Sequence, residues 1–458
     1  MIWRNTIFNQ RPMSPNLRAL AKDPQWFLQR GVGSLLMMVA LGLSLGGCGL
    51  IGTGFEGPSR VEILGQSGQY QMLRNGEVYR PVGAGSVPGQ LESLKAHGAN
   101  SIRTWHVGDG GILDDAHALG LTVSLCLDVG RERLGFDYDD ADAVAEQLEE
   151  FRETVRKFKN HPALLTWIIG NELNIESKNP KVWNAVNDIA LMIKAEDPNH
   201  PVTTALAGLG SKEVRALAQR APALDFISAQ VYGGISGLAQ AMDRVGLDKP
   251  LMVTEWGTRG HWETRATQWR APIELSSARK AEHYISGYKN VLEPNADRII
   301  GSYAFLWGQK QERTPTWYGT LTASGHRTEA ADALFFLWQG RWPENRAPQV
   351  SGLTLNGKRP ESSLRVRPGQ RLEAQVSMLD READPLTLTW IVRPESQAKQ
   401  VGGDLERVPP VVPGLLKVSE GDRALLSAPA TSGAYRLFVR VEDTAGGVGH
   451  ANFPFWVR

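Results

Sequence analysis

The chain has 458 residues, which is too long for one ordinary domain and favours two or three. Hydrophobic residues make up 42% of it, and its 14 tryptophans add to what can fill a large core. With 50 basic and 49 acidic residues the formal net charge is +1, so no basic excess indicates nucleic-acid binding and no long charged block indicates a disordered tail. These totals predict a globular, tryptophan-rich protein that does not bind nucleic acid.

The N-terminal segment has the layout of a secretory signal. Arg30 precedes a mostly apolar run that is too short to span a membrane and ends in small residues. The sequence LGGC at 45–48 resembles a bacterial lipobox, which implies that Cys48 is lipidated and becomes the mature N-terminus. An ordinary signal with an incidental cysteine is the alternative. Because Gly49 rather than Asp follows, we expect a lipid-anchored protein of the cell envelope, at the outer membrane, or else a secreted protein.

From residue 79 to residue 340, short apolar segments alternate with segments of helical spacing. The expected strands are 79–86, 99–107, 121–130, 163–174, 201–208, 224–234, 250–258 and 299–309. The expected helices are 87–98, 110–120, 140–160, 180–197, 211–220, 236–246, 274–292 and 329–340. Continuous apolar strands are typical of a buried parallel sheet, and eight strand–helix units in about 250 residues predict a (β/α)₈ TIM barrel.

A doubly wound open sheet is the alternative to the barrel. It would favour a phosphate loop such as GxGxxG after the first strand. The sequence GAGSVPGQ at 83–90 matches that pattern only faintly, so we favour the barrel.

Beyond the barrel the pattern changes to alternation with period two, as in GAYRLFVRVED at 433–443. Such strands, separated by turn residues, predict a small all-β, immunoglobulin-like sandwich. The expected organisation is a signal segment, a lead-in with strands, a catalytic barrel, a linker and a β-sandwich, at 1–47, 48–78, 79–340, 341–348 and 349–458.

Three aspartates of the predicted sandwich, Asp380, Asp384 and Asp443, are able to hold calcium. Aspartate also forms turns, and we favour that explanation, so no metal site is predicted. The surrounding sequences, LDREADPLTLTW and VEDTAGGVGHANFPFWV, resemble the tandem modules found on secreted bacterial polysaccharide enzymes.

Chemically useful side chains gather at the predicted C-terminal ends of the barrel strands, where TIM barrels carry their active sites. The opposite rim has nothing comparable. The residues at these strand ends are Arg103, His106, Asp128, Asn171, Glu172, Tyr232, Glu255 and Trp307.

Two glutamates end otherwise apolar strands: Glu172 in TWIIGNEL and Glu255 in LMVTEWG. Glutamate is rarely buried without a partner, so a structural ion pair is the alternative to catalysis. Glycoside hydrolysis requires two carboxyl groups, about 5–5.5 Å apart in retaining enzymes and roughly 6.5–9.5 Å apart in inverting ones. The fourth and seventh strands face each other across a small barrel, so the two side chains can meet at its mouth. Two close carboxylates do not both ionise easily, so one pKa rises and that group becomes the acid.

The sequences HPALLTWIIGNELN and LMVTEWG resemble the fourth- and seventh-strand signatures of clan A glycoside hydrolases, most closely the barrel domain of family 2. The resemblance implies a retaining double displacement with Glu172 as acid/base and Glu255 as nucleophile. It further implies that Asn171 bonds the sugar 2-hydroxyl and that Arg103 supports the nucleophile. Tyr232 would lie beside the nucleophile.

The same resemblance places Trp307 beneath the bound sugar. Alternatives stay open at several positions: a salt bridge for Arg103, loop capping for Asp128, and packing for Tyr232 and Trp307. His106 is expected to bond at the rim rather than to bind a metal, because no cluster has zinc-like spacing.

Two features depart from family 2. Residues 49–78 are too few for the β-sandwich domains that usually precede the barrel. The second-strand motif continues as TWHVGDGG at 104–111 instead of a His-x-Pro sequence, which affects the shape of the sugar subsites.

The sequence therefore predicts a retaining glycoside hydrolase that cleaves β-linked polysaccharide or oligosaccharide and needs no cofactor or metal. Aromatic and polar groups expected to line its sugar subsites are Trp105, Trp256, Trp307, Gln309, Lys310 and Trp317. A transglycosylase that uses the same intermediate is one alternative. A non-catalytic, carbohydrate-binding envelope lipoprotein is another.

Overall fold

The computed structural model describes residues 57–86, 89–399 and 403–458, which belong to one compact unit, Gly54–Arg458. The predicted signal segment and Cys48 lie outside the described residues, so the lipid anchor stays a prediction. No helix among the described residues combines the length and apolar character needed to cross a membrane.

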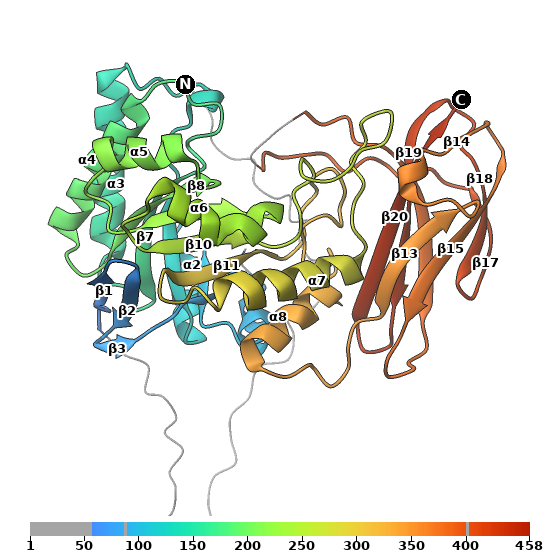
Figure 1. Ribbon diagram of the computed structural model, residues 1–458, viewed down its shortest axis with the longest axis horizontal. Coiled ribbons are helices and arrows are strands. Elements are labelled where there is room, and N and C mark those ends of the chain that lie inside the picture. Colours follow the sequence, from blue (N-terminus) through green and yellow to red (C-terminus); the bar gives the residue numbers. More distant parts are fainter. Residues whose placement is uncertain (1–56, 87–88, 400–402) are drawn as a thin grey trace, which may run out of the picture. The chain divides into compact units, whose positions relative to one another are not determined.

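Eight parallel strands close into a barrel in the order β10-β11-β4-β5-β6-β7-β8-β9 (Figure 1). Their bounds are β4 Val82–Ser86, β5 Ser101–Arg103, β6 Thr122–Leu127, β7 Leu164–Asn171, β8 Val202–Ala207, β9 Ile227–Val231, β10 Leu251–Trp256 and β11 Ile299–Trp307. The helices are α1 Leu91–Ala96, α2 Gly111–Ala118, α3 Ala141–Phe158, α4 Lys181–Glu196, α5 Ser211–Arg220, α6 Leu238–Val245, α7 Ser277–Gly287 and α8 Glu329–Gln339. The predicted fold class, a TIM barrel followed by β-sheets, is confirmed.

The strands are buried on both sides, which explains their continuous apolar sequence. Every residue of β7 and of β10 is buried. Inside the barrel, a layer of hydroxyl groups forms hydrogen bonds within the layer. The Tyr303 hydroxyl lies 2.8 Å from both Ser101 Oγ and Ser124 Oγ. Thr166 Oγ1 donates to Ser124 Oγ at 2.9 Å. This layer fills the barrel, so the strand ends above it carry the chemistry.

The lead-in residues form a three-stranded sheet, with β1 Val61–Gln66, β2 Gln69–Arg74 and β3 Glu77–Val78. Val61, Tyr70 and Met72 of this sheet pack in one apolar cluster with residues near the starts of three barrel strands. Those barrel residues are Leu165, Met252 and Ile300. The small sheet therefore covers the N-terminal end of the barrel and leaves the C-terminal end for function.

The C-terminal part has two sheets around a core of its own (Figure 1). One sheet contains β16 Thr387–Pro394, β19 Gly433–Glu442 and β20 Gly447–Val457, joined by the short β12 Arg327–Thr328 and β14 Arg365–Val366. The other contains β13 Gln349–Leu355, β15 Arg371–Leu379, β17 Leu416–Glu420 and β18 Arg423–Ser427. Both short strands pair parallel to β20, so the first sheet is not purely antiparallel. Because β12 directly precedes α8, this sheet includes a short strand from the barrel part of the chain.

A buried ion pair joins the barrel to the sheets. Lys280 Nζ of α7 lies 2.5 Å from Glu274 Oε1, and both side chains are almost fully buried. Asn452 of β20 donates to Glu274 Oε2 at 2.5 Å, and Thr314 Oγ1 donates to the same oxygen at 2.6 Å. Burial alone would raise the pKa of Glu274, but Lys280 and these donors outweigh it and hold that pKa at about 2.

Replacing Lys280 with Met should destabilise the protein by about 3–5 kcal/mol, because it leaves Glu274 buried without its cation. The contribution of a carboxyl group with a lowered pKa is present above its ordinary value of 4.5 and is lost as the pH falls towards 2. The deficit of Lys280→Met should therefore shrink below pH 4.5, which denaturant unfolding at several pH values would measure.

The matched control is Lys289→Met. Lys289 also pairs with a glutamate, Glu293, but both side chains are exposed, so the loss should be at most about 1 kcal/mol. Equal losses in the two variants would contradict the importance of the buried pair.

Candidate active site

The backbone at the end of β7 takes an unusual path that presents Glu172. Gly170 has φ +73° and Glu172 has φ +53°, so both lie in the left-handed region. A Cβ atom at Gly170 would come within 2.6 Å of the Leu173 side chain, which requires glycine there. The left-handed backbone conformation of Glu172 costs roughly 1–2 kcal/mol of conformational free energy. Backbone strain of this kind is typical of functional sites. Its N–H donates to Ala205 O of β8 at 2.8 Å, which fixes the turn.

Glu255, the other carboxylate, is 4% exposed and accepts hydrogen bonds on both oxygens. Arg103 Nη1 and Trp105 Nε1 donate to Oε1, the latter at 2.7 Å. Tyr232 Oη donates to Oε2 at 2.6 Å. An ionised carboxylate only accepts, so three donors, one of them a guanidinium, suit its charged form and hold it in one orientation.

Asn171 is held by the same arginine. Its Oδ1 accepts from Arg103 Nη2 at 2.9 Å and from Gln230 Nε2 at 2.6 Å. Two donors on one oxygen fix the orientation of the amide, so the Nδ2 group points away from them. The amide is therefore ready to donate to a ligand beside the carboxylates.

The two acids differ in their electrostatic environment. Burial, together with the nearby charge of Glu255, raises the pKa of Glu172 to about 8, against a smaller opposing effect of Arg103. Burial and the charges of both glutamates also raise the pKa of Tyr232 well above its ordinary value, so its phenol stays protonated and donates. At neutral pH the site therefore holds a protonated Glu172 beside Glu255, whose two oxygens accept from three donors.

Aromatic side chains surround this pair. Phe305 of β11 lies edge-on to Trp105, with ring centroids 5.7 Å apart, and to Tyr232 at 5.8 Å. Trp262 packs edge-on against Tyr232 at 5.6 Å and is 61% exposed, so it offers an open apolar face beside the site. Flat apolar faces of this kind suit the rings of sugars.

The structure corrects the expectation that Trp256 and Trp307 contact the sugar. Both are at most 1% exposed, and Trp256 packs against Tyr284 while Trp307 packs against Trp338, on the helix side of the strands. Successive strand residues point to opposite faces, so an inward Glu255 sends Trp256 outward. The register against β4 shifts between Ala304 and Trp307, so Phe305 reaches the site instead.

Trp317 also lacks an exposed face. It is 1% exposed, its Nε1 donates to Arg259 O at 2.9 Å, and it packs in one cluster with Tyr232 and Phe305. Its place is therefore behind the residues that border the site, where it supports them without an open face for a sugar.

Four other predicted rim residues differ in their surroundings. The Asp128 side chain is 57% exposed and pairs with Arg131 at 3.0 Å. His106 is exposed. Gln309 donates to Pro315 O at 2.8 Å and so holds its own loop, whereas Lys310 Nζ lies 5.8 Å from the Phe305 ring. Lys310 therefore lies near an aromatic side chain that borders the site.

Trp105 was expected from the sequence to line the sugar subsites, and the structure adds its bond to Glu255. Gln230, which orients Asn171 and lies two positions from Tyr232, was missed. Because side chains two apart along a strand share a face, period two was the available signal for Gln230.

A segment of the C-terminal sheets also reaches the rim. Asp404 binds Arg133 through two hydrogen bonds, of 2.7 and 3.0 Å, and Glu406 Oε1 accepts from Gln311 Nε2 at 3.0 Å. The bond to Asp404 raises the pKa of Arg133, with a smaller contribution from Glu172, which places this arginine near the acids. Leu405, between the two acidic residues, is 90% exposed.

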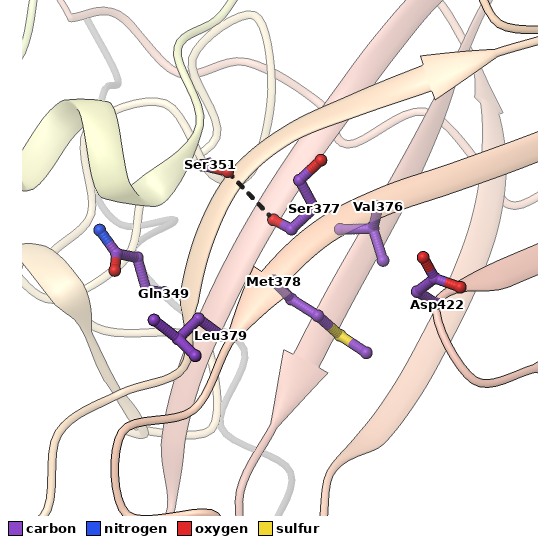
Figure 2. A pocket seen from close by; sticks show the side chains of 7 residues that line it. All are labelled: Gln349, Ser351, Val376, Ser377, Met378, Leu379 and Asp422. Atoms are coloured by element: carbon purple, nitrogen blue, oxygen red, sulfur yellow. Dashed lines mark hydrogen bonds between the residues drawn. The ribbon is translucent and has the colours of Figure 1, made fainter.

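A separate hollow lies on the second sheet and is lined by Gln349, Ser351, Val376, Ser377, Met378, Leu379 and Asp422 (Figure 2). Asp422 is its one carboxylate, and it accepts from Gln375. Two-carboxylate chemistry therefore belongs to the barrel. In the described part of the chain, the side chains grouped closely enough to hold a metal are Asp380, Asp384 and Asp443, which are not part of this site.

Comparison with known families agrees with this geometry. Residues 80–263 match the family model described as glycosyl hydrolases family 2, TIM barrel domain. This part of the chain is therefore similar to the catalytic barrel of family 2 glycoside hydrolases. The matched stretch contains both Glu172 and Glu255.

Solved structures resemble this chain at low identity. The β-galacturonidase of Eisenbergiella tayi, bound to galacturonate, is 18% identical with a TM-score of 0.50, over 62% of this chain and 55% of its own. A Bacteroides uniformis β-glucuronidase is 16% identical with a TM-score of 0.47, over 87% of this chain and 48% of its own. This chain thus spans about half the length of these proteins, and the likeness describes the fold. A search of curated proteins finds no match.

Replacing Glu172 with Gln should stabilise the protein at alkaline pH. The folded-state pKa of about 8 lies above the ordinary 4.5, so the contribution of the bound proton is complete below 4.5 and is lost as the pH rises through 8. Glutamine stays neutral, so the variant should gain up to a few kcal/mol over wild type at pH 8–9, since each pH unit is worth about 1.4 kcal/mol.

Thermal unfolding of both proteins from pH 4 to pH 9 measures this gain. The two melting temperatures should agree near pH 4 and separate progressively as the pH rises from 4.5 to about 8. The exposed Glu293→Gln should follow wild type throughout, and a Glu172→Gln curve parallel to wild type would contradict the raised pKa.

Proposed function

We propose that this protein hydrolyses the β-glycosidic bonds of an oligosaccharide or polysaccharide, with retention of the anomeric configuration. The observation that carries the proposal is the contrast between the two acids: Glu172 keeps its proton to about pH 8, beside a Glu255 that three donors hold as a carboxylate. This is the pair that a double displacement requires. The family 2 barrel supports the same chemistry.

In the first step Glu255 attacks the anomeric carbon while Glu172 gives its proton to the leaving oxygen. A glycosyl ester on Glu255 forms and the glycosidic bond breaks. In the second step Glu172, now ionised, takes a proton from water, the water oxygen attacks the same carbon, and Glu255 is released. Two inversions give net retention.

The neighbours of the acids have distinct roles in this scheme. Arg103 and Tyr232 orient Glu255 for attack, and Asn171 offers its Nδ2 group to a sugar hydroxyl. The exposed face of Trp262 suits a further sugar unit, which is why we propose a chain of sugars as the substrate.

Replacing Glu255 with Ala should abolish hydrolysis, because no group is left to form the glycosyl ester.

Replacing Glu172 with Gln should slow cleavage of β-linked oligosaccharides about 10²–10⁴-fold, the usual contribution of a general acid. The loss should be smaller for aryl glycosides whose leaving group needs no proton. Wild-type activity should fall above about pH 8, where Glu172 loses its proton.

A panel of β-linked oligosaccharides and aryl β-glycosides, followed by ¹H NMR of the first product anomer, measures these outcomes. Glu293→Gln, an exposed variant far from both acids in sequence, serves as the control. Full activity in Glu255→Ala would refute the assignment, and an α-anomer as first product would refute retention. Products lengthened by an added acceptor sugar would identify a transglycosylase instead.

We also propose that the chain is held at the bacterial envelope by lipid on Cys48, on the strength of the signal-like sequence that ends there. Mass spectrometry of the N-terminal peptide should find an acylated Cys48 in membrane fractions, and Cys48→Ser should be released from them. An unmodified N-terminus at another residue would contradict the anchor.

A further inference from the structure

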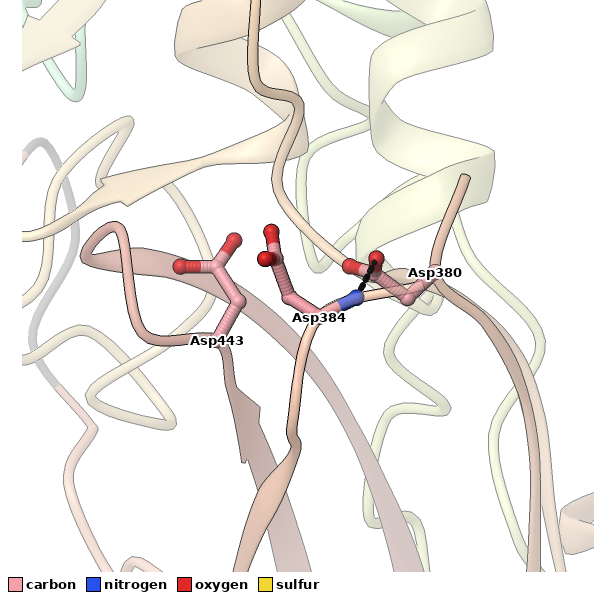
Figure 3. Close-up of side chains that lie close together, drawn as sticks. All are labelled: Asp380, Asp384 and Asp443. Atoms are coloured by element: carbon pink, nitrogen blue, oxygen red, sulfur yellow. Dashed lines mark hydrogen bonds between the residues drawn. The ribbon is translucent and has the colours of Figure 1, made fainter. Parts of the chain in front are cut away.

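Three aspartates from two loops of the C-terminal sheets lie together. Asp380 and Asp384 belong to the connection between β15 and β16, and Asp443 follows β19. Each offers a carboxylate oxygen within 4.8 Å of the others, and Figure 3 shows the three side chains turned toward one another.

Two of their six carboxylate oxygens are accounted for by the turns. Asp443 Oδ1 accepts from the N–H groups of Ala445 and Gly447 at 2.8 and 2.7 Å, and Asp380 Oδ1 accepts from Asp384 N–H at 2.8 Å. These bonds are what turn-forming aspartates make.

The remaining oxygens are not explained by turn formation. Asp443 is 5% exposed, and its Oδ2 is buried with no hydrogen-bond partner among the described residues. Asp380 Oδ2 is likewise buried and unpartnered in this part of the structure. Asp384 accepts from Asn345 Nδ2. None of the three carboxylates forms an ion pair with any Lys, Arg or His that the structure describes.

This arrangement is unfavourable for three anions by themselves. Desolvated carboxylate oxygens without donors are costly, and like charges at this separation repel. A bound cation removes both penalties, because it ligates the unpartnered oxygens and neutralises the charge.

We infer that Asp380, Asp384 and Asp443 bind one Ca²⁺ ion. All three ligands are hard oxygens, and Ca²⁺ binds oxygen at about 2.3–2.6 Å, so ligands on opposite sides of one ion lie roughly 4.6–5.2 Å apart. The spread of up to 4.8 Å in this cluster fits that range. Ca²⁺ accepts several carboxylates in a flexible geometry, whereas Mg²⁺ requires near-ideal octahedral geometry and usually keeps several waters, so three carboxylates on one ion favour Ca²⁺.

The position of the site gives the ion a structural role at the joint between the barrel and the sheets. Asn345 lies between α8 and β13, and its carbonyl accepts from Arg327 Nη2 at 2.7 Å. Arg327 of β12 also donates to Ala445 O and pairs in register with Gly447, just beyond Asp443. An ion that fixes the Asp443 turn and the Asn345–Asp384 contact therefore stabilises the attachment of the sheets to the barrel.

The test uses the purified protein, freed of metal with EDTA, and CaCl₂ or MgCl₂ as the probe. Calorimetric titration should find one Ca²⁺ equivalent, and Ca²⁺ should raise the melting temperature by several degrees more than Mg²⁺ does. Asp443→Asn should lose both the heat of binding and the rise in melting temperature. If Asp443→Asn does not fold, Asp380→Asn gives the same readout from a less buried position.

Glu382→Gln is the matched control. Glu382 lies between Asp380 and Asp384 in the same loop but is exposed and outside the cluster, so this variant should bind Ca²⁺ as wild type does. Three results would each overturn the inference: no Ca²⁺ uptake at millimolar concentration, an equal response to Mg²⁺, or loss of binding in Glu382→Gln comparable to that in Asp443→Asn.

Discussion

The buried contact between Arg103 and Glu255 is the interaction on which the rest of the site depends. Arg103 is fully buried at the end of β5, and its two terminal nitrogens reach β10 through Glu255 and β7 through Asn171. A buried ion pair is costly unless its remaining hydrogen bonds are satisfied, and Trp105 and Tyr232 satisfy those of the carboxylate. One guanidinium thus fixes the geometry of groups from three strands of the barrel.

The same ion pair also influences Glu172, because both of its members act on the Glu172 carboxyl group. A carboxylate held beside a second, partly buried carboxyl group makes ionisation of the second unfavourable, so the proton stays on Glu172 to about pH 8. The left-handed backbone at Glu172 shows that the fold accepts strain in order to place this side chain. The protein therefore carries an unequal pair of acids, which is the arrangement that acid-assisted displacement at a sugar carbon uses.

The C-terminal sheets are more than an appendage to the barrel. Asn452 of the sheets donates to Glu274, which also accepts from Thr314. Asp404, between β16 and β17, accepts from Arg133 at the rim. Glu274 and Thr314 lie in the segments that follow β10 and β11, and Arg133 lies in the segment that precedes α3. The substrate-facing rim is therefore shaped by two parts of the chain more than 200 residues apart, as the Arg133–Asp404 bond across 271 positions illustrates.

The sequence by itself determined the barrel, its eight strand–helix units and the two strand-end glutamates, because apolar period and strand-end chemistry are local properties of the chain. It also identified Arg103, Asn171 and Tyr232, through a family resemblance. The outward direction of Trp256 likewise follows from the local alternation that turns Glu255 inward. Tertiary structure alone decided that Trp307 faces the helices and that Phe305 takes the place beside Tyr232. The reason is that the register shift near Trp307 depends on pairing with a neighbouring strand, and no local pattern encodes that pairing. The same holds for Asp380, Asp384 and Asp443, whose turn chemistry is local but whose proximity exists only after β15, β16 and β19 have come together.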